Sequence, residues 1–158
     1  MMKRMTFVRT PRFLMAVAWL LHVVAWFLPV YAGTYPLPKW LPGWEAFNVA
    51  LSAFYDYGHP KPWYAVVIGA LSALSTILFI VGSPWVALRG SRRLRLVSAW
   101  AASVAFVNNT TWYLLSNDRA ELRAGYFLWC LSFAVLAVAL FRFAKETTDE
   151  RAARAFGP

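Results

Sequence analysis

The chain has 158 residues, of which 60% are hydrophobic and 15% are charged, and its formal net charge at pH 7 is +9. Soluble domains hold roughly 45–50% apolar residues, so this composition argues against an ordinary soluble core. In a soluble protein such a charge would suggest nucleic acid. Here the basic clusters stand beside long apolar stretches, where anionic lipid headgroups attract them, and no nucleic acid is expected as a partner.

Four continuous apolar stretches are each long enough to cross the hydrocarbon core of a bilayer, which needs roughly 20 residues of helix. A spanning segment must satisfy its own backbone hydrogen bonds, so continuous runs indicate helices instead of the alternating strands of a barrel. We therefore predict an all-α fold, with residues 1–158 forming one integral membrane four-helix bundle. The predicted helices cover about residues 13–31, 63–88, 96–115 and 125–143, with an outer loop at 32–62 and a cytoplasmic tail at 144–158.

The distribution of basic residues predicts the orientation, because lysine and arginine collect in cytoplasmic loops. Twelve of the sixteen lie in the N-terminal segment, in the loop at 89–95 and in the tail. The opposite side holds four, and four acidic residues balance them. Both termini are therefore expected to face the cytoplasm, and a bacterial cytoplasmic (inner) membrane is the simplest location.

The first predicted helix also resembles a signal peptide, since a basic start and an apolar run precede Val30-Tyr31-Ala32 and a glycine. Against cleavage, the run is longer than a usual signal core and has Pro29 close to the cut. We favour a retained helix, and removal of residues 1–32 stays an alternative. At its middle, His22 can donate and accept one hydrogen bond, with Asn108, Asn109 or a serine of the second helix as expected partner. A proton relay or a haem ligand is the sharper interpretation of this histidine.

The outer loop is rich in aromatic residues and is expected to contain a short interfacial helix after Pro42 and Gly43. There Trp44, Phe47, Leu51 and Phe54 recur at spacings of three and four, which places them on one helix face. Such a helix would lie in the membrane interface with its aromatic side chains buried. An ordinary aromatic belt is one interpretation, and a lid or docking surface is the other. For the latter, the predicted partner-binding residues are Trp40, Trp44, Phe47 and Phe54.

The second predicted helix is expected to bend near Pro84, which follows Gly82 and removes a backbone donor. The loop after it carries Arg89, Arg92, Arg93 and Arg95. These four are the predicted lipid-headgroup residues, with an ordinary positively charged cytoplasmic loop as the alternative.

The third predicted helix contains Asn108-Asn109-Thr110-Thr111, a polar cluster at membrane depth. Polar side chains there normally face the bundle interior or a wet cavity. Successive residues are about 100° apart, so one asparagine should point inward and the other toward a neighbouring helix, while the threonines can bond their own backbone. The cluster is interpreted either as interhelical hydrogen bonding or as part of a ligand site.

The fourth predicted helix places Tyr126 at the same depth, with Cys130 on the same face. If the helices pack so, His22, Asn108, Asn109, Thr111 and Tyr126 line one polar pocket that opens to the outer side. These five are the predicted ligand-binding residues. A single cysteine excludes an intramolecular disulfide.

The sequence does not support an enzyme, because it contains none of the searched metal, nucleophile or phosphate motifs, and no catalytic residue, metal or cofactor is predicted. Two functions remain. The first is a non-enzymatic accessory, assembly or recognition (immunity-type) partner of another membrane component, or a self-associating protein. The alternative is a protein that binds or transports a small ligand such as a lipid, a quinone or an ion.

Overall fold

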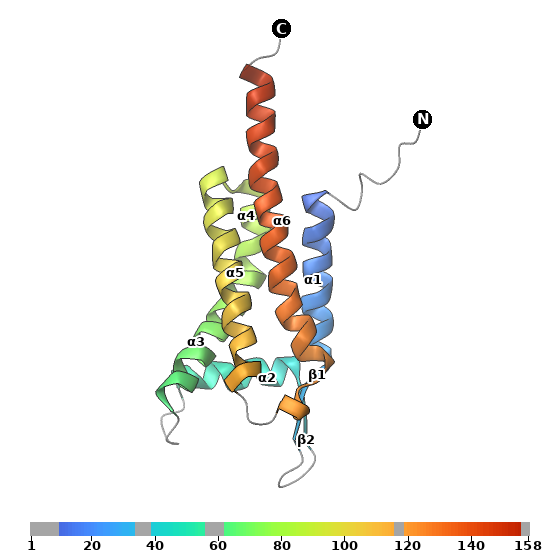
Figure 1. Cartoon of the computed structure of the whole chain (residues 1–158), viewed down its shortest axis with the longest axis vertical. Coiled ribbons are helices and arrows are strands. Elements are labelled where there is room, and N and C mark those ends of the chain that lie inside the picture. The colour runs from blue at the N-terminus through green and yellow to red at the C-terminus, as the bar shows by residue number, and fades with distance from the viewer. Residues whose placement is uncertain (1–9, 34–38, 56–61, 116–118, 156–158) are drawn as a thin grey trace, which may run out of the picture.

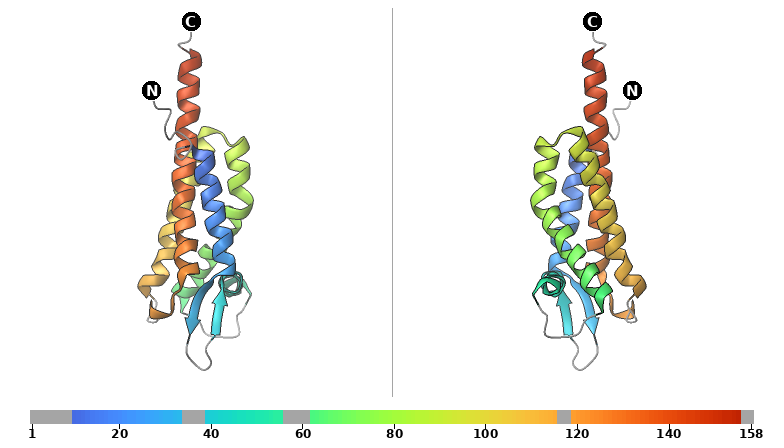
Figure 2. Two further views of the ribbon diagram at one scale, coloured as in Figure 1. Left: turned by 90° about the vertical axis from the view of Figure 1, so that its right-hand side faces the viewer. Right: turned by 90° about the vertical axis from the view of Figure 1, so that its left-hand side faces the viewer.

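The computed structural model describes residues 10–33, 39–55, 62–115 and 119–155 (Figure 1). Parts of the predicted loop and tail, at 34–38, 56–61 and 156–158, lie outside the described residues, as do 1–9 and 116–118. The described chain is mostly helical, so the all-α prediction is confirmed, with one small hairpin added. Long helices run side by side, and a short helix crosses one end of them (Figures 1 and 2).

Helix α1, Pro11–Phe27, begins and ends earlier than predicted. The Thr10 hydroxyl caps it by accepting a hydrogen bond from the Phe13 amide at 3.4 Å. The predicted end at Tyr31 is wrong, because a residue before proline avoids the helical conformation and Leu28, before Pro29, is extended. With 17 residues, α1 is apolar but shorter than the roughly 20 that a full span needs.

Strands β1, Pro29–Gly33, and β2, Lys39–Pro42, form an antiparallel hairpin directly after α1. This hairpin was not predicted, because β1 continues the apolar run of α1 in the sequence. A backbone hydrogen bond joins the hairpin to the residue before the last helix: the Arg123 amide donates to the Val30 carbonyl at 2.9 Å.

Helix α2, Gly43–Leu51, is extended by a 3-10 turn, η2, Ser52–Phe54. The predicted short helix of the outer loop is therefore confirmed. It lies across the end of the bundle, beside the hairpin (Figures 1 and 2). A side chain at Gly43 would collide with the Ala25 carbonyl oxygen, so glycine allows α2 to pack closely against α1.

The second predicted helix is one continuous helical segment with an irregular middle. It consists of α3, Trp63–Ile77, a π-helical turn, η3, Leu78–Gly82, and α4, Ser83–Arg89. The irregularity comes one turn before Pro84, close to the predicted bend. There the Phe79 carbonyl accepts from both the amide and the hydroxyl of Ser83, the latter at 2.7 Å.

The last two helices extend beyond their predicted ends. Helix α5, Arg92–Leu115, starts four residues early, because the Ser91 hydroxyl accepts from the Leu94 amide at 3.3 Å and arginine is a good helix former. Helix α6, Ala124–Ala155, continues through most of the predicted tail for the same reason: charged residues end an apolar stretch but not a helix. The described chain starts and ends at the same end of the bundle, where α4 also turns into α5 (Figure 1).

Helix α6 lies at the centre of the bundle and packs against both α1 and α5. The main core is built from small and aromatic side chains, among them Ala18, Phe79, Ala99 and Phe133. Buried polar residues lie among them: His22, Ser72, Thr76, Ser83, Asn109 and Ser132. The Trp19 indole, for example, donates to the Ser83 hydroxyl at 3.1 Å and links α1 to α4.

Two described helical segments, Trp63–Arg89 and Ala124–Glu146, are long and apolar enough to cross a membrane. In the most apolar stretch of the first segment 28% of the residues are buried, against 56% in the second. Four spans were predicted, and α1 and α5 are not among those that qualify. Proline 29 shortens α1, and α5 carries basic residues in its first turn and the Asn-Thr cluster near its end.

Candidate functional site

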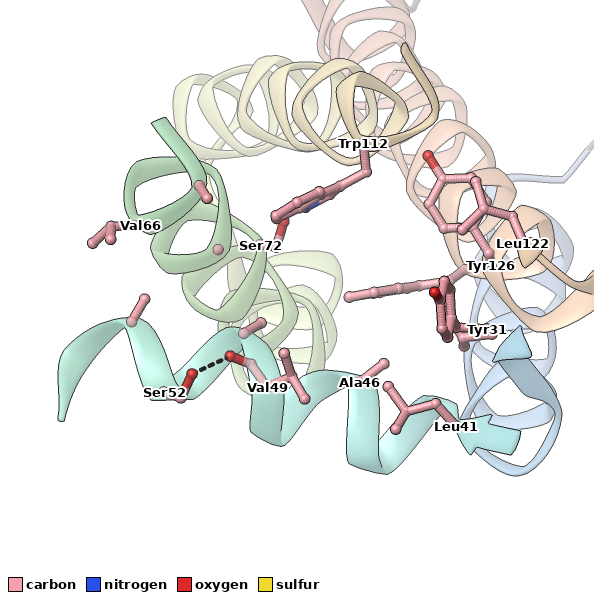
Figure 3. A pocket seen from close by; sticks show the side chains of 16 residues that line it. Tyr31, Leu41, Ala46, Val49, Ser52, Val66, Ser72, Trp112, Leu122 and Tyr126 are labelled. Atoms are coloured by element: carbon pink, nitrogen blue, oxygen red, sulfur yellow. Dashed lines mark hydrogen bonds between the residues drawn. The ribbon is translucent and has the colours of Figure 1, made fainter. Parts of the chain in front are cut away.

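A cavity of about 370 Å³ lies where α2 crosses the bundle, which is within the usual range for small-molecule sites (Figure 3). Its walls come from the hairpin, α2, α3, α5 and the start of α6. Small residues on α2 and α3 leave the space open, namely Ala46, Ala50, Ala53, Ala65 and Gly69. Larger rings close it from the other side: Trp112 reaches in from α5 and Tyr126 from α6 (Figure 3).

Tyr126 is the member of the predicted ligand set that lines this cavity. Its ring is buried, but its hydroxyl is already occupied. It donates to the Asn109 carbonyl at 2.7 Å and accepts from the Tyr113 amide at 3.1 Å. The phenol therefore fixes α6 against α5, and what it offers a ligand is the face of its ring.

The two asparagines face different ways, as predicted. The Asn108 amide donates to the Ile68 carbonyl at 3.3 Å and to the Ser72 hydroxyl at 3.1 Å, which joins α5 to α3. Asn109 is 1% exposed, and its side-chain nitrogen and oxygen have no hydrogen-bond partner among the described residues. Thr110 and Thr111 bond their own helix, through the carbonyls of Phe106 and Val107.

His22 is buried away from these asparagines. Its Nδ1 lies 3.0 Å from the Ser132 hydroxyl of α6, and its ring stacks on Phe79 at 4.1 Å between centroids. The expected hydrogen-bond partners on the second and third predicted helices are therefore wrong: Phe79 of the second helix gives His22 a ring contact, and the hydrogen bond goes to α6. His22, Asn108, Asn109 and Thr111 are absent from the lining of the cavity that contains Tyr126, so the five predicted ligand residues do not line it together.

Trp129 is a wall residue of the cavity that the sequence analysis did not select. Its side chain is 9% exposed, and its indole N–H is buried with no acceptor among the described residues. An indole nitrogen can only donate. The sequence feature that could have selected Trp129 is its position one turn after Tyr126, inside the predicted span instead of at the end of the span.

The aromatic residues of the outer loop lie mostly outside the packed core. Trp40, Trp44 and Phe54 are exposed, while Phe47 is half-buried with its ring 5.6 Å from that of Trp26. The opposite face of α2 carries the small residues and packs on α3, where Ala50 and Ala53 approach Gly69. The aromatic stripe is therefore not a lid whose rings fill the bundle.

The four predicted headgroup residues divide into two groups. Arg89, Arg92 and Arg93 are exposed. Arg95 is half-buried and donates to the carbonyls of Val86, Ala87 and Phe143, at 3.5, 3.0 and 3.3 Å. Its guanidinium thus holds the α4–α5 corner against α6, and this geometry favours a structural role for Arg95 over headgroup binding.

Among the described residues, no three His, Cys, Asp or Glu side chains lie close enough together to hold a metal ion. No protein family, curated protein or solved structure matches the chain.

Proposed function

We propose that the chain is an integral four-helix bundle of a bacterial cytoplasmic membrane, in which α1, the α3–α4 segment, α5 and α6 span the bilayer with both termini in the cytoplasm. The support is a distribution of polar and apolar side chains that is inverted relative to a soluble protein. Exposed apolar side chains occur on every one of these helices, including Leu20, Val67, Leu71, Val81, Val97, Val104, Val107, Leu131 and Val138, whereas polar residues lie inside. Lipid favours this arrangement and water opposes it.

In this placement, α2 lies in the outer interface, parallel to the membrane surface. Its orientation across the bundle end favours this (Figure 1). So do the exposed rings of Trp40, Trp44 and Phe54, because aromatic side chains prefer the headgroup zone. We call these three residues the outer aromatic face.

Within that membrane, we propose that the protein is a non-enzymatic accessory, assembly or recognition partner of another membrane component. One observation carries this proposal: the small-residue face of α2 seats the helix on the bundle, so that its aromatic side chains are held outward on a fixed support. Exposed, preorganised aromatic residues are typical of binding hot spots.

Photo-crosslinking in the membranes of the source organism tests the proposal. A benzophenone amino acid replaces Trp40, Trp44 or, as a control, Val97, which is as exposed as Trp40 and lies in the second turn of α5. Helix α5 begins at the end of the bundle opposite to α2 (Figure 1). We expect one polypeptide to be joined at the two tryptophan positions and not at Val97, and an adduct with a second copy would assign self-association.

The double variant Trp40→Ala, Trp44→Ala should lose the same partner in co-purification, while Val97→Ala keeps it. Both variants should unfold at the temperature of the parent protein, because the side chains removed are exposed. Lipid adducts alone at all three positions would refute the proposed recognition role.

A further inference from the structure

We infer that the cavity beneath α2 is a binding site for the hydrocarbon chain of a membrane lipid, either a phospholipid or a prenylated quinone, which lies along the small-residue wall. This site is separate from the outer aromatic face and goes beyond the proposed recognition function. It rests on the proposed membrane location, which supplies the ligand.

The chemistry of the wall selects an apolar occupant. Most side chains that line the cavity are hydrocarbon, and several polar groups on it are already bonded within the protein. The Ser72 hydroxyl accepts from Asn108, the Ser52 hydroxyl donates to the Val49 carbonyl, and the Tyr126 hydroxyl bridges to α5. A charged or strongly hydrated ligand would leave its polar groups unpaired there.

The cavity is also accessible from the surface. Val49 of α2 belongs to its wall and is 60% exposed, so the cavity opens beside the helix that the proposed placement puts at the membrane interface. The entrance does not lie between α2 and α3 at Gly69, because an added Cβ there would already touch Ala53 at 3.6 Å. Inside the cavity, the small side chains of Ala46, Ala50 and Ala65 leave room for a hydrocarbon chain.

The test uses the full chain in nanodiscs that contain a phosphatidylglycerol with a diazirine in one acyl chain. After illumination, peptide mass spectrometry measures the labelled fraction at the cavity wall and at the outward residues of α5 and α6. We expect the label to concentrate on the cavity wall. An even distribution over the exposed faces would overturn the inference.

Two variants sharpen the test. Ala46→Leu with Ala65→Leu fills the cavity and should lower wall labelling about tenfold, whereas Ala16→Leu, exposed on α1, should not change it.

Competition distinguishes the two ligand sources. The occupant is the quinone if a prenylated benzoquinone suppresses wall labelling at an amount equimolar to the labelled lipid, while unlabelled phosphatidylglycerol suppresses it only in excess. The reverse order assigns the phospholipid. Wall labelling that neither molecule suppresses would overturn the inference. Carbonate extraction of the source membranes separates two failures: release of the protein refutes the membrane location, while retention without wall labelling refutes only the lipid site.

Discussion

The neighbouring asparagines of α5 should respond in opposite directions to the same substitution. Asn108→Leu removes two hydrogen bonds to α3, at 3.3 and 3.1 Å. Interhelical hydrogen bonds in membranes average roughly 0.6 kcal/mol and reach about 1.7 kcal/mol, so we expect the free energy of unfolding to fall by about 1–3 kcal/mol. Leucine has the same branched heavy-atom framework as asparagine but is larger, so overpacking adds to the cost of the lost bonds.

Asn109→Leu removes an amide whose donor and acceptor are both buried and unpaired among the described residues. Each unsatisfied buried polar group costs about 1–3 kcal/mol, and leucine removes two such groups, whereas its greater bulk in a packed site costs about 1–3 kcal/mol. We therefore expect the free energy of unfolding to stay unchanged or to rise by about 1–3 kcal/mol.

Equilibrium unfolding of the purified protein in mixed micelles, with rising dodecyl sulfate, measures both effects. Asn108→Ser and Asn109→Ser serve as controls that keep a small polar side chain in each place. A destabilisation above about 1 kcal/mol by Asn109→Leu would refute the reasoning, because it would show that this amide has a partner in the folded protein. An unchanged Asn108→Leu would refute the assigned link between α5 and α3.

Gly43→Ala should lower the thermal unfolding temperature, because the new methyl group collides with the α1 backbone. Gly69→Ala has 3.6 Å to its nearest atoms and should keep or raise that temperature. Equal effects of the two variants would contradict the close packing of α2 on α1. Arg95→Lys should lower the free energy of unfolding by about 1–3 kcal/mol in the same assay, since one lysine cannot reach all three carbonyls. The control Arg92→Lys changes an exposed residue and should have no effect. The reverse order would contradict the structural role of Arg95. Glu146→Cys should react with a membrane-impermeant maleimide only in inverted vesicles, since the native cysteine is buried; labelling of intact cells would reverse the proposed orientation.

Hydropathy located the long helices but placed several of their ends wrongly. It reads how long a chain stays apolar, whereas a helix ends where its backbone geometry changes. Pro29 stops α1 inside an apolar run, and the hairpin that follows is as apolar as the helix. Arg92 and Arg93 were assigned to a loop, although arginine continues a helix readily and these residues form the first turn of α5.

The periodicity of α2 predicted the helix and its aromatic stripe, but it did not predict which face packs on the bundle. Trp44 and Phe54 carry the strongest apolar signal in the segment, and both are exposed. The buried face is made of Gly43, Ala46 and Ala50, because only small side chains allow α2 to lie so close to α1 and α3. In a membrane, close approach selects small residues and lipid accepts large ones, so hydrophobicity does not distinguish inside from outside.

The partner of His22 could not be predicted, because a one-dimensional pattern does not say which helices are neighbours. The histidine was assigned to the Asn-Thr cluster by depth alone. In the fold, α6 stands between α1 and α5, so Ser132 receives the contact instead. The cavity wall was missed for the same reason, since it combines residues from the hairpin and four helices.

The central place of α6 also sets the order in which the protein can be assembled. Among the described helices α6 is the last to be synthesised, yet α1, the first of them, depends on it for the only hydrogen bond described for His22. Until α6 arrives, α1 of the proposed membrane bundle has an unpaired imidazole at its middle and lacks the helix that supplies most of its packing. Nascent chains truncated before residue 124 should therefore be held by insertion factors or proteolysed, and the bundle closes only once α6 has been inserted.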